Sequence, residues 1–283
     1  MLHHRLLVSF AFALALLCAP SVRAQIVDFA KYPNLFGQWG PIGGPGRYDI
    51  SKPWGPGQEA PLTSEYQAIF EENLRDQAAG GQGWDRDFVC QSPGMPRVTN
   101  GYGQLEFVIT PTTVHFLTQH IHDNRRIFTD GRDWRKNIEP SFLGYSIGKW
   151  IDTTGSGKYD RLDIETRGPF RGPRAYDTSG IPLHRDNQTI VKEKIYLNKD
   201  DHNVLQDEVT VIDNALTRPW VVMKSYRRVD DPQPYWREVN CMDNNNHLEI
   251  GGQNYMLSAD GLLMPAKKDQ PPPDLRYFNH TRK

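Results

Sequence analysis

From Gln104 onward, the chain consists mainly of short segments in which apolar and polar residues alternate. An alternation with period two is typical of β-strands that bury one face, and turn-forming residues separate most of these segments. The expected strands cover residues 105–110, 113–121, 124–129, 144–151, 159–167, 188–198, 203–213, 219–228 and 236–242. Nine strands with short connections favour an antiparallel meander. Because open sheet edges promote association, we expect a mainly β fold that closes into an up-and-down barrel, with a sandwich as the second choice.

One helix is expected before the sheet, over residues 63–79. Thr63 or Ser64 can cap it, an apolar stripe at helical spacing follows, and Gly80-Gly81 ends it. The expected organisation is a signal peptide (1–24), an extended Gly/Pro-rich arm (25–62), a single helix-plus-barrel domain (63–266) and a Pro-rich C-terminal tail (267–283).

The first 24 residues have the pattern of a secretory signal peptide. A short polar start (3–5) precedes an apolar run (6–17), and Val22-Arg23-Ala24 offers a cleavage site after Ala24. The run is short for a membrane span, so we expect a periplasmic or secreted protein without a stable membrane anchor. The remaining chain carries 31 Lys and Arg against 34 Asp and Glu, with no basic patch. This balance argues against nucleic acid as a partner.

Export would leave two cysteines, Cys90 and Cys241. In an oxidising compartment such a pair favours a disulfide, and two buried inert thiols are the alternative. The bridge would close a loop of about 150 residues, which the chain-entropy model credits with roughly 4–5 kcal/mol.

The segment 113–133 concentrates residues suited to proton transfer or to binding a polar ligand. Strand alternation predicts that Val114, Phe116, Thr118, His120 and His122 share one face, and that His115, Leu117, Gln119 and Ile121 share the other. The candidate catalytic residues here and nearby are His120, His122, Arg126, Asp130 and Tyr145, with Arg132 as a binding residue.

His120 and His122 also form a His-x-His pair that could share one divalent metal ion. A metal site needs further ligands, and the candidates are distant in sequence: His184, His247, Asp177 and Asp243. Polar lining of a cavity or of the surface is the alternative, and no cofactor is otherwise expected.

The segment 168–187 is a long irregular connection between two expected strands, and loops of this length are often functional. His184 is a further catalytic candidate, and Arg174, Tyr176 and Asp177 are candidate binding residues, with Arg171 and Arg185 close by. A solvated loop held by salt bridges is the alternative.

Other common sites find little support. The chain has no Gly-x-Ser-x-Gly motif and no phosphate-binding loop. Residues 152–163 have the outline of a calcium loop, but Thr154 and Ser156 stand where acidic residues are preferred. A glycine-rich hairpin turn is the favoured interpretation.

Six motifs resemble a large, poorly characterised family of exported bacterial proteins. They are Phe36-Gly37-Gln38-Trp39, Pro61-Leu62-Thr63-Ser64-Glu65-Tyr66, Pro93-Gly94-Met95-Pro96-Arg97, Arg125-Arg126-Ile127-Phe128-Thr129-Asp130-Gly131-Arg132, Gly144-Tyr145-Ser146-Ile147-Gly148-Lys149-Trp150 and Ala215-Leu216-Thr217-Arg218-Pro219-Trp220. The resemblance implies export and a β-rich fold, and it implies no activity. Gly37-Gln38-Trp39 also resembles the Gly-x-Trp that opens lipocalin barrels.

Three hypotheses about function follow. The first is an exported enzyme that processes a small organic molecule by cofactor-free acid–base chemistry, as a lyase, isomerase or hydrolase, with a histidine as base and an arginine stabilising the developing anion. The second is a lipocalin-like carrier that binds a small molecule without changing it. The third is a metal-dependent enzyme or metal-binding protein that uses His120 and His122.

Overall fold

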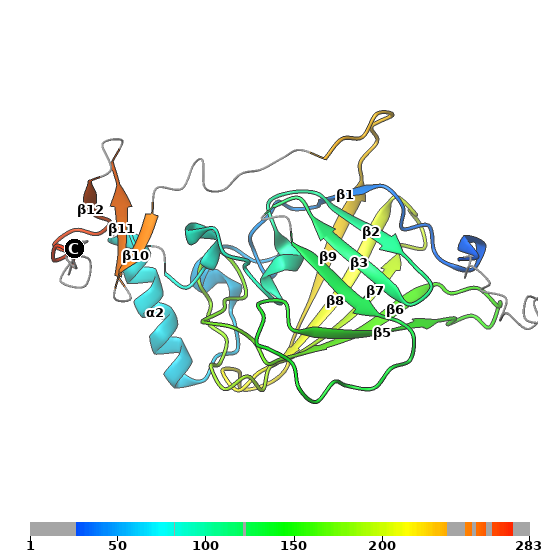
Figure 1. Ribbon diagram of the computed structural model, residues 1–283, viewed down its shortest axis with the longest axis horizontal. Coiled ribbons are helices and arrows are strands. Elements are labelled where there is room, and N and C mark those ends of the chain that lie inside the picture. Colours follow the sequence, from blue (N-terminus) through cyan, green and yellow to red (C-terminus); the bar gives the residue numbers. More distant parts are fainter. Residues whose placement is uncertain are drawn as a thin grey trace, which may run out of the picture.

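A computed structural model describes residues 27–81, 83–120, 123–236, 247–250, 253–258 and 262–273. Nine strands form a closed barrel (Figure 1). They are β1 (Gln38–Pro41), β2 (Leu105–Ile109), β3 (Thr113–Thr118), β4 (Asn124–Phe128), β5 (Tyr145–Ile151), β6 (Arg161–Arg167), β7 (Ile190–Leu197), β8 (Val204–Ile212) and β9 (Trp220–Arg228). Each strand pairs with the next in chain order, and β1 pairs with β9 to close the ring.

The predicted up-and-down barrel is therefore confirmed, with two differences in detail. The strand that closes it, β1, lies within the segment expected to be an arm, because four residues are too few for a visible alternation. The pair β4–β5 is parallel while the other pairs are antiparallel, because the connection 129–144 carries the chain back to the end where β4 began. The expected strand at 236–242 falls, after residue 236, outside the described residues.

The predicted helix is present as α2 (Ser64–Ala78), and the Thr63 hydroxyl caps it by accepting a hydrogen bond from the Tyr66 N–H at 3.4 Å. Four short 3₁₀ helices are also described: η1 (Phe29–Lys31), η2 (Gly55–Gln58), η3 (Arg86–Val89) and η4 (Arg97–Asn100). A separate antiparallel sheet contains β10 (His247–Ile250), β11 (Gln253–Leu257) and β12 (Leu263–Pro265). Figure 1 shows α2 and this sheet beyond the same end of the barrel.

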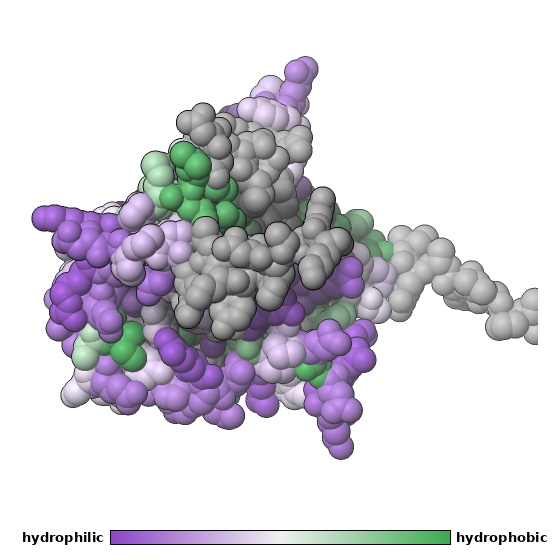
Figure 2. All heavy atoms as spheres, turned by 60° about the vertical axis from the view of Figure 1, so that its left-hand side comes forward, coloured by the Kyte–Doolittle hydropathy of each residue, from purple (hydrophilic) through white to green (hydrophobic). Residues whose placement is uncertain are grey.

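Figure 2 brings that end forward, and the surface coloured there by hydropathy is mostly hydrophilic with small hydrophobic patches. Within the described part of the chain, no helix has the length and hydrophobicity needed to cross a membrane.

The interior of the barrel is filled by two hydrophobic clusters. The cluster near α2 contains, among others, Tyr48, Phe70, Val191, Val209, Val211, Trp220 and Val222. The cluster at the opposite end contains Trp39, Phe107, Phe116, Leu162, Ile195, Leu205, Tyr226 and their neighbours. Such close packing makes this barrel a core rather than an open container.

A layer of polar side chains separates the two clusters, and each of the strands β4 to β9 contributes one member. This polar layer consists of Arg125, Ser146, Thr166, Glu193, Asp207 and Lys224, all of them buried. On β7, for example, Glu193 stands between Val191 of one cluster and Ile195 of the other. The inward positions thus change from apolar to polar at one level of the barrel.

Arg125 joins four strands of the polar layer. Its guanidinium donates to both carboxylate oxygens of Glu193, at 2.8 and 2.5 Å, and also to the hydroxyls of Ser146 and Thr166, at 3.0 and 2.7 Å. The Arg125 and Glu193 side chains are 1% and 0% exposed. A buried ion pair offsets its desolvation only with such bidentate geometry and further hydrogen bonds.

The other two charged members of the polar layer, Lys224 and Asp207, have no bidentate partner of this kind. The Lys224 ammonium donates to the carbonyls of Arg47 and Tyr48, and burial lowers its pKa to about 7. Neither carboxyl oxygen of Asp207 has a hydrogen-bond partner among the described residues. Burial, together with the nearby charge of Glu193, raises the pKa of Asp207 well above its ordinary value.

We predict that Arg125→Met destabilises the protein by about 3–5 kcal/mol, because it leaves the Glu193 carboxylate buried without its partner. Urea denaturation measures the loss. Arg126→Met, at the neighbouring exposed position of β4, is the matched control and should change stability by no more than about 0.5 kcal/mol. Equal effects of the two substitutions would contradict the role given to the ion pair.

Asp207 predicts a specific dependence of stability on pH. The unfolded chain releases this proton near pH 3.8, whereas the folded protein keeps it to a higher pH, so stability falls as pH rises through that window. Asp207→Asn removes this loss. The free energy of unfolding of the variant should gain on that of the parent as pH rises above 4, by at most about 1.4 kcal/mol per pH unit. Parallel pH profiles of the two proteins would show that Asp207 is ionised in the folded state.

Candidate functional site

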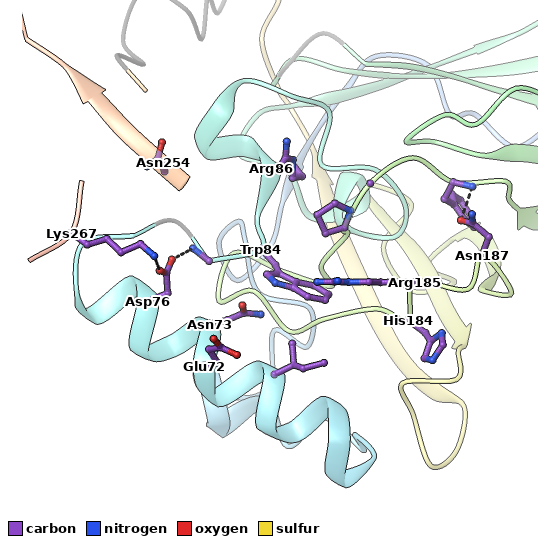
Figure 3. Close-up of a pocket in the computed structure, with 15 residues that line it drawn as sticks. Glu72, Asn73, Asp76, Trp84, Arg86, His184, Arg185, Asn187, Asn254 and Lys267 are labelled. Carbon is purple, nitrogen blue, oxygen red and sulfur yellow. Dashed lines mark hydrogen bonds and ion pairs between the residues drawn. The ribbon is translucent and has the colours of Figure 1, made fainter. Parts of the chain in front are cut away.

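A cavity of about 790 Å³ lies beyond the barrel, beside α2. The segment 83–86, the loop 170–187 and two residues of the C-terminal segment complete its walls (Figure 3). It brings together one indole, one imidazole, three basic side chains, two acidic side chains and three asparagines. Mixed polar and aromatic lining of this kind is typical of sites for small organic ligands.

Side chains of α2 position the walls of the cavity. The buried Asn73 amide donates to the carbonyl of Gly180 at 2.8 Å, and this bond fixes the loop 170–187 against the helix. Near the end of α2, the Asp76 carboxylate accepts from the Gly83 N–H at 2.9 Å and pairs with Lys267. These contacts explain why segments far apart in sequence share one cavity.

Trp84 and Arg185 form the most distinctive contact of the site. The Arg185 guanidinium lies over the indole, 4.6 Å from the ring centroid, and Figure 3 shows the two groups stacked. The side chain of Arg185 makes no hydrogen bond or ion pair with another described residue. Stacking therefore leaves the N–H groups on the guanidinium edge available to a ligand.

The remaining charges of the cavity are distributed around this stack. Figure 3 shows Glu72 beside Asn73 on α2, while Lys267 and Asn254 lie at one end. Lys267 is neutralised by Asp76, whereas Glu72 has no ion pair with a described residue. Of the other basic residues, Arg86 donates to the Oε1 of Gln91, so Arg185 is the cation of the lining without a described hydrogen-bond partner.

His184 lies on the side of the cavity away from Lys267 (Figure 3). Its Nδ1 is 3.0 Å from Oδ1 of Asp186 and 3.1 Å from the Asp186 N–H, and its ring packs against Tyr66. Burial pushes the pKa of Asp186 up, but hydrogen bonds from Gln188, Asn214 and His184 outweigh it and lower that pKa below its ordinary value. Nε2 of His184 makes no hydrogen bond with a described residue. It can act as a general base in the tautomer whose Nδ1–H donates to Oδ1 of Asp186, whereas the Asp186 N–H contact belongs to the other tautomer.

The hairpin candidates lie elsewhere. His120 follows the end of β3, and its Nε2 is 3.2 Å from Oδ2 of Asp87, which also pairs with the buried Arg97 at 2.9 Å. His120 thus belongs to a network outside the cavity, and His122 falls outside the described residues. Because β3 ends at Thr118, the expected alternation does not extend to His120.

Of the other hairpin candidates, Arg126 and Tyr145 line a second, smaller cavity of about 370 Å³. Asp130 and Arg132 form an exposed ion pair at 2.6 Å. Arg132 lowers the pKa of Asp130 to about 2, so at neutral pH this carboxylate holds no proton to donate. The structure therefore does not bring His120, Asp130 and His184 into one site.

The three predicted binding residues of the long loop are buried in the core instead of lining the larger cavity. Arg174 donates to the carbonyl of Met95 at 3.1 Å and to Thr189, and Asp177 closes a turn by accepting hydrogen bonds from Ser179. Tyr176 is fully buried against aromatic neighbours. Their contacts are those of residues that hold the loop in place.

The described residues do not decide the predictions of a metal site and of a disulfide. Among the described residues no group of three or more potential ligands is placed to hold a metal ion. In the calcium-like segment, Asp152 accepts hydrogen bonds from four successive backbone N–H groups, those of residues 154 to 157, which fits the favoured hairpin turn. Cys241 lies outside the described residues, so the Cys90–Cys241 bridge stays a prediction.

Sequence reasoning missed Trp84 and Glu72, and it named Arg185 only as one of several arginines of the long loop that could bind an anion. Arg185 lies in the loop 168–187, whose length had marked it as a candidate. Trp84 follows a glycine-rich stretch after α2, which indicates an irregular segment but not its position. Only the fold brings these residues together.

Comparison of the sequence with protein-family models and with curated proteins gave no match.

Proposed function

We propose that this protein binds a small organic carboxylate in the cavity beside α2. The observation that carries the proposal is the Arg185 guanidinium, stacked on Trp84 and without a hydrogen-bond partner among the described residues. A planar guanidinium presents paired N–H groups that match the two oxygens of a carboxylate.

The packed barrel supports an external site. Carriers of the lipocalin type hold their ligand inside the barrel, whereas here two hydrophobic clusters and the polar layer occupy that space. The cavity of about 790 Å³ is large enough for a ligand of drug-like size. The partner is thus still the small organic molecule expected from the sequence, but its proposed site is the cavity beside α2 instead of the hairpin 113–133.

We predict that Arg185→Gln weakens binding of benzoate by about tenfold or more, because a charge-assisted bidentate contact is lost. Isothermal titration measures the affinity. Benzamide, the neutral analogue, should bind the parent as weakly as benzoate binds the variant.

Arg171→Gln is the matched control, since Arg171 lies in the same loop over Phe142 and does not line the cavity. Equal losses in the two variants, or equal binding of benzoate and benzamide, would contradict the proposal.

Acid–base catalysis is the second candidate, and the His184–Asp186 pair favours it. In this scheme Nε2 of His184 removes a proton from the carbon next to a bound carboxylate. Arg185 stabilises the negative charge that moves onto the carboxylate, and Asp186 holds the imidazole in place.

The fate of the ligand distinguishes the two functions. We expect His184→Asn to bind small carboxylates within about twofold of the parent, since the charge of Arg185 is kept. If the protein is an enzyme, mass spectrometry should show that this variant no longer converts the carboxylate. The control variant His115→Asn, on the outer face of β3, should still convert it. Carboxylates recovered unchanged from the parent would leave binding as the function.

The proposal also places the protein outside the cytoplasm. This part rests on the signal-peptide pattern of residues 1–24, and a Cys90–Cys241 disulfide would accompany it.

A further inference from the structure

A groove of about 1070 Å³ lies at the end of the barrel opposite α2. Its walls are the N-terminal segment 30–34, the turns 153–160 and 199–203, and outward side chains of β6, β7 and β8. In Figure 1 the β5–β6 turn and the N-terminal segment lie together at the far end from α2. The groove is thus separate from the proposed carboxylate site, and the inference drawn from it does not depend on that site.

Aromatic side chains form one wall of the groove. The ring of Tyr32 packs against Trp150 and Tyr159, with centroids 4.9 and 5.3 Å apart. A backbone hydrogen bond from Tyr159 to Lys31, at 2.7 Å, holds the N-terminal segment against the β5–β6 turn. Tyr159 remains 36% exposed, so part of its ring faces the solvent.

Basic residues outnumber acidic ones around this surface. Five basic side chains, Lys158, Arg161, Lys194, Lys199 and Arg228, line the groove together with His202, against two acidic residues, Asp160 and Glu208. Arg161 pairs with Asp163 and Lys194 with Glu208, so the positive excess of the groove comes from Lys158, Lys199 and Arg228, in a protein whose formal net charge is −1.

The two acidic residues are already engaged. Glu208 pairs with Lys194 at 2.6 Å, and Asp160 accepts from the N–H of Thr153 at 3.0 Å. Lys158 and Lys199 are exposed and form no ion pair with a described residue. These two lysines are exposed cations of the groove, whereas Arg228 is held by the backbone carbonyls of Phe36 and Asn34.

The backbone of the β5–β6 turn is not available to an anion. The Asp152 carboxylate already accepts the N–H groups of residues 154 to 157, at 2.6 to 3.2 Å. Recognition would therefore come from side chains at the rim, which are spread along the groove rather than focused on one point.

We infer that the groove binds an acidic oligosaccharide. The exposed ring of Tyr159 offers a surface to the C–H face of a sugar ring, and the Thr, Asn and Tyr side chains offer hydrogen bonds to its hydroxyls. The lysines complement carboxylate or sulfate groups spaced along the chain. Its volume of about 1070 Å³ leaves room for several linked sugar units.

The experiment is isothermal titration of the full protein with a sulfated hexasaccharide and with neutral maltohexaose. We expect the sulfated sugar to bind at least about tenfold more tightly. Lys158→Glu combined with Lys199→Glu should weaken its binding by about tenfold or more.

Lys136→Glu combined with Lys268→Glu makes the same change of net charge at exposed lysines outside the groove, and should leave the affinity within about twofold. Equal losses in the two double variants would show attraction to the whole protein and overturn the inference. Equal affinity for maltohexaose and the sulfated sugar would also overturn the inference. So would a single-stranded oligonucleotide that binds as tightly as the sulfated sugar.

A third arm tests the aromatic wall. Tyr159→Ser keeps every charge and removes an exposed ring, and we expect it to weaken binding of the sulfated hexasaccharide while circular dichroism shows an unchanged fold. An unchanged affinity in Tyr159→Ser would overturn the assignment to a sugar.

Discussion

The architecture of this protein depends on one buried contact, the ion pair between Arg125 and Glu193. It lies at the level where inward positions on β4 to β9 change from apolar to polar, and it links four strands through two hydroxyls. A charge in that place is tolerated only while its partner and its hydrogen bonds are present. The pair therefore favours the observed register of the strands around it, and it is the centre of the polar layer that divides the core into two hydrophobic clusters.

The filled barrel explains where a ligand site can form. With apolar side chains on both sides of the polar layer, the barrel serves as a rigid support, and the cavities lie on its outside. One is built at the α2 end, where Asn73 and Asp76 hold two loops against the helix. The other lies at the opposite end, where two turns meet the N-terminal segment. Their linings favour different anions, because one offers a stacked guanidinium and the other an aromatic wall with lysines.

Much of the fold could be predicted from local sequence, because alternation and turn residues act over a few positions. The eight strands from β2 to β9 and helix α2 were visible in this way, whereas β1 was too short to show a period. The polar layer leaves a weak signal, since Glu193 interrupts an inward apolar series on β7. Which side chains meet across the barrel depends on its closure. For the same reason Arg126 was chosen as a site residue, although Arg125 is the one that points inward.

The central claim is that a small carboxylate binds outside the barrel, against Trp84 and Arg185. Its most direct test is the ¹H–¹⁵N NMR spectrum of the tryptophan indoles during titration with benzoate. Trp84 reports on the cavity, while Trp39 and Trp220 are buried in the two clusters of the barrel. The account predicts that the Trp84 signal shifts and that those of Trp39 and Trp220 stay in place. A shift of Trp39 or Trp220 with Trp84 unchanged would contradict it and return the ligand to the barrel interior.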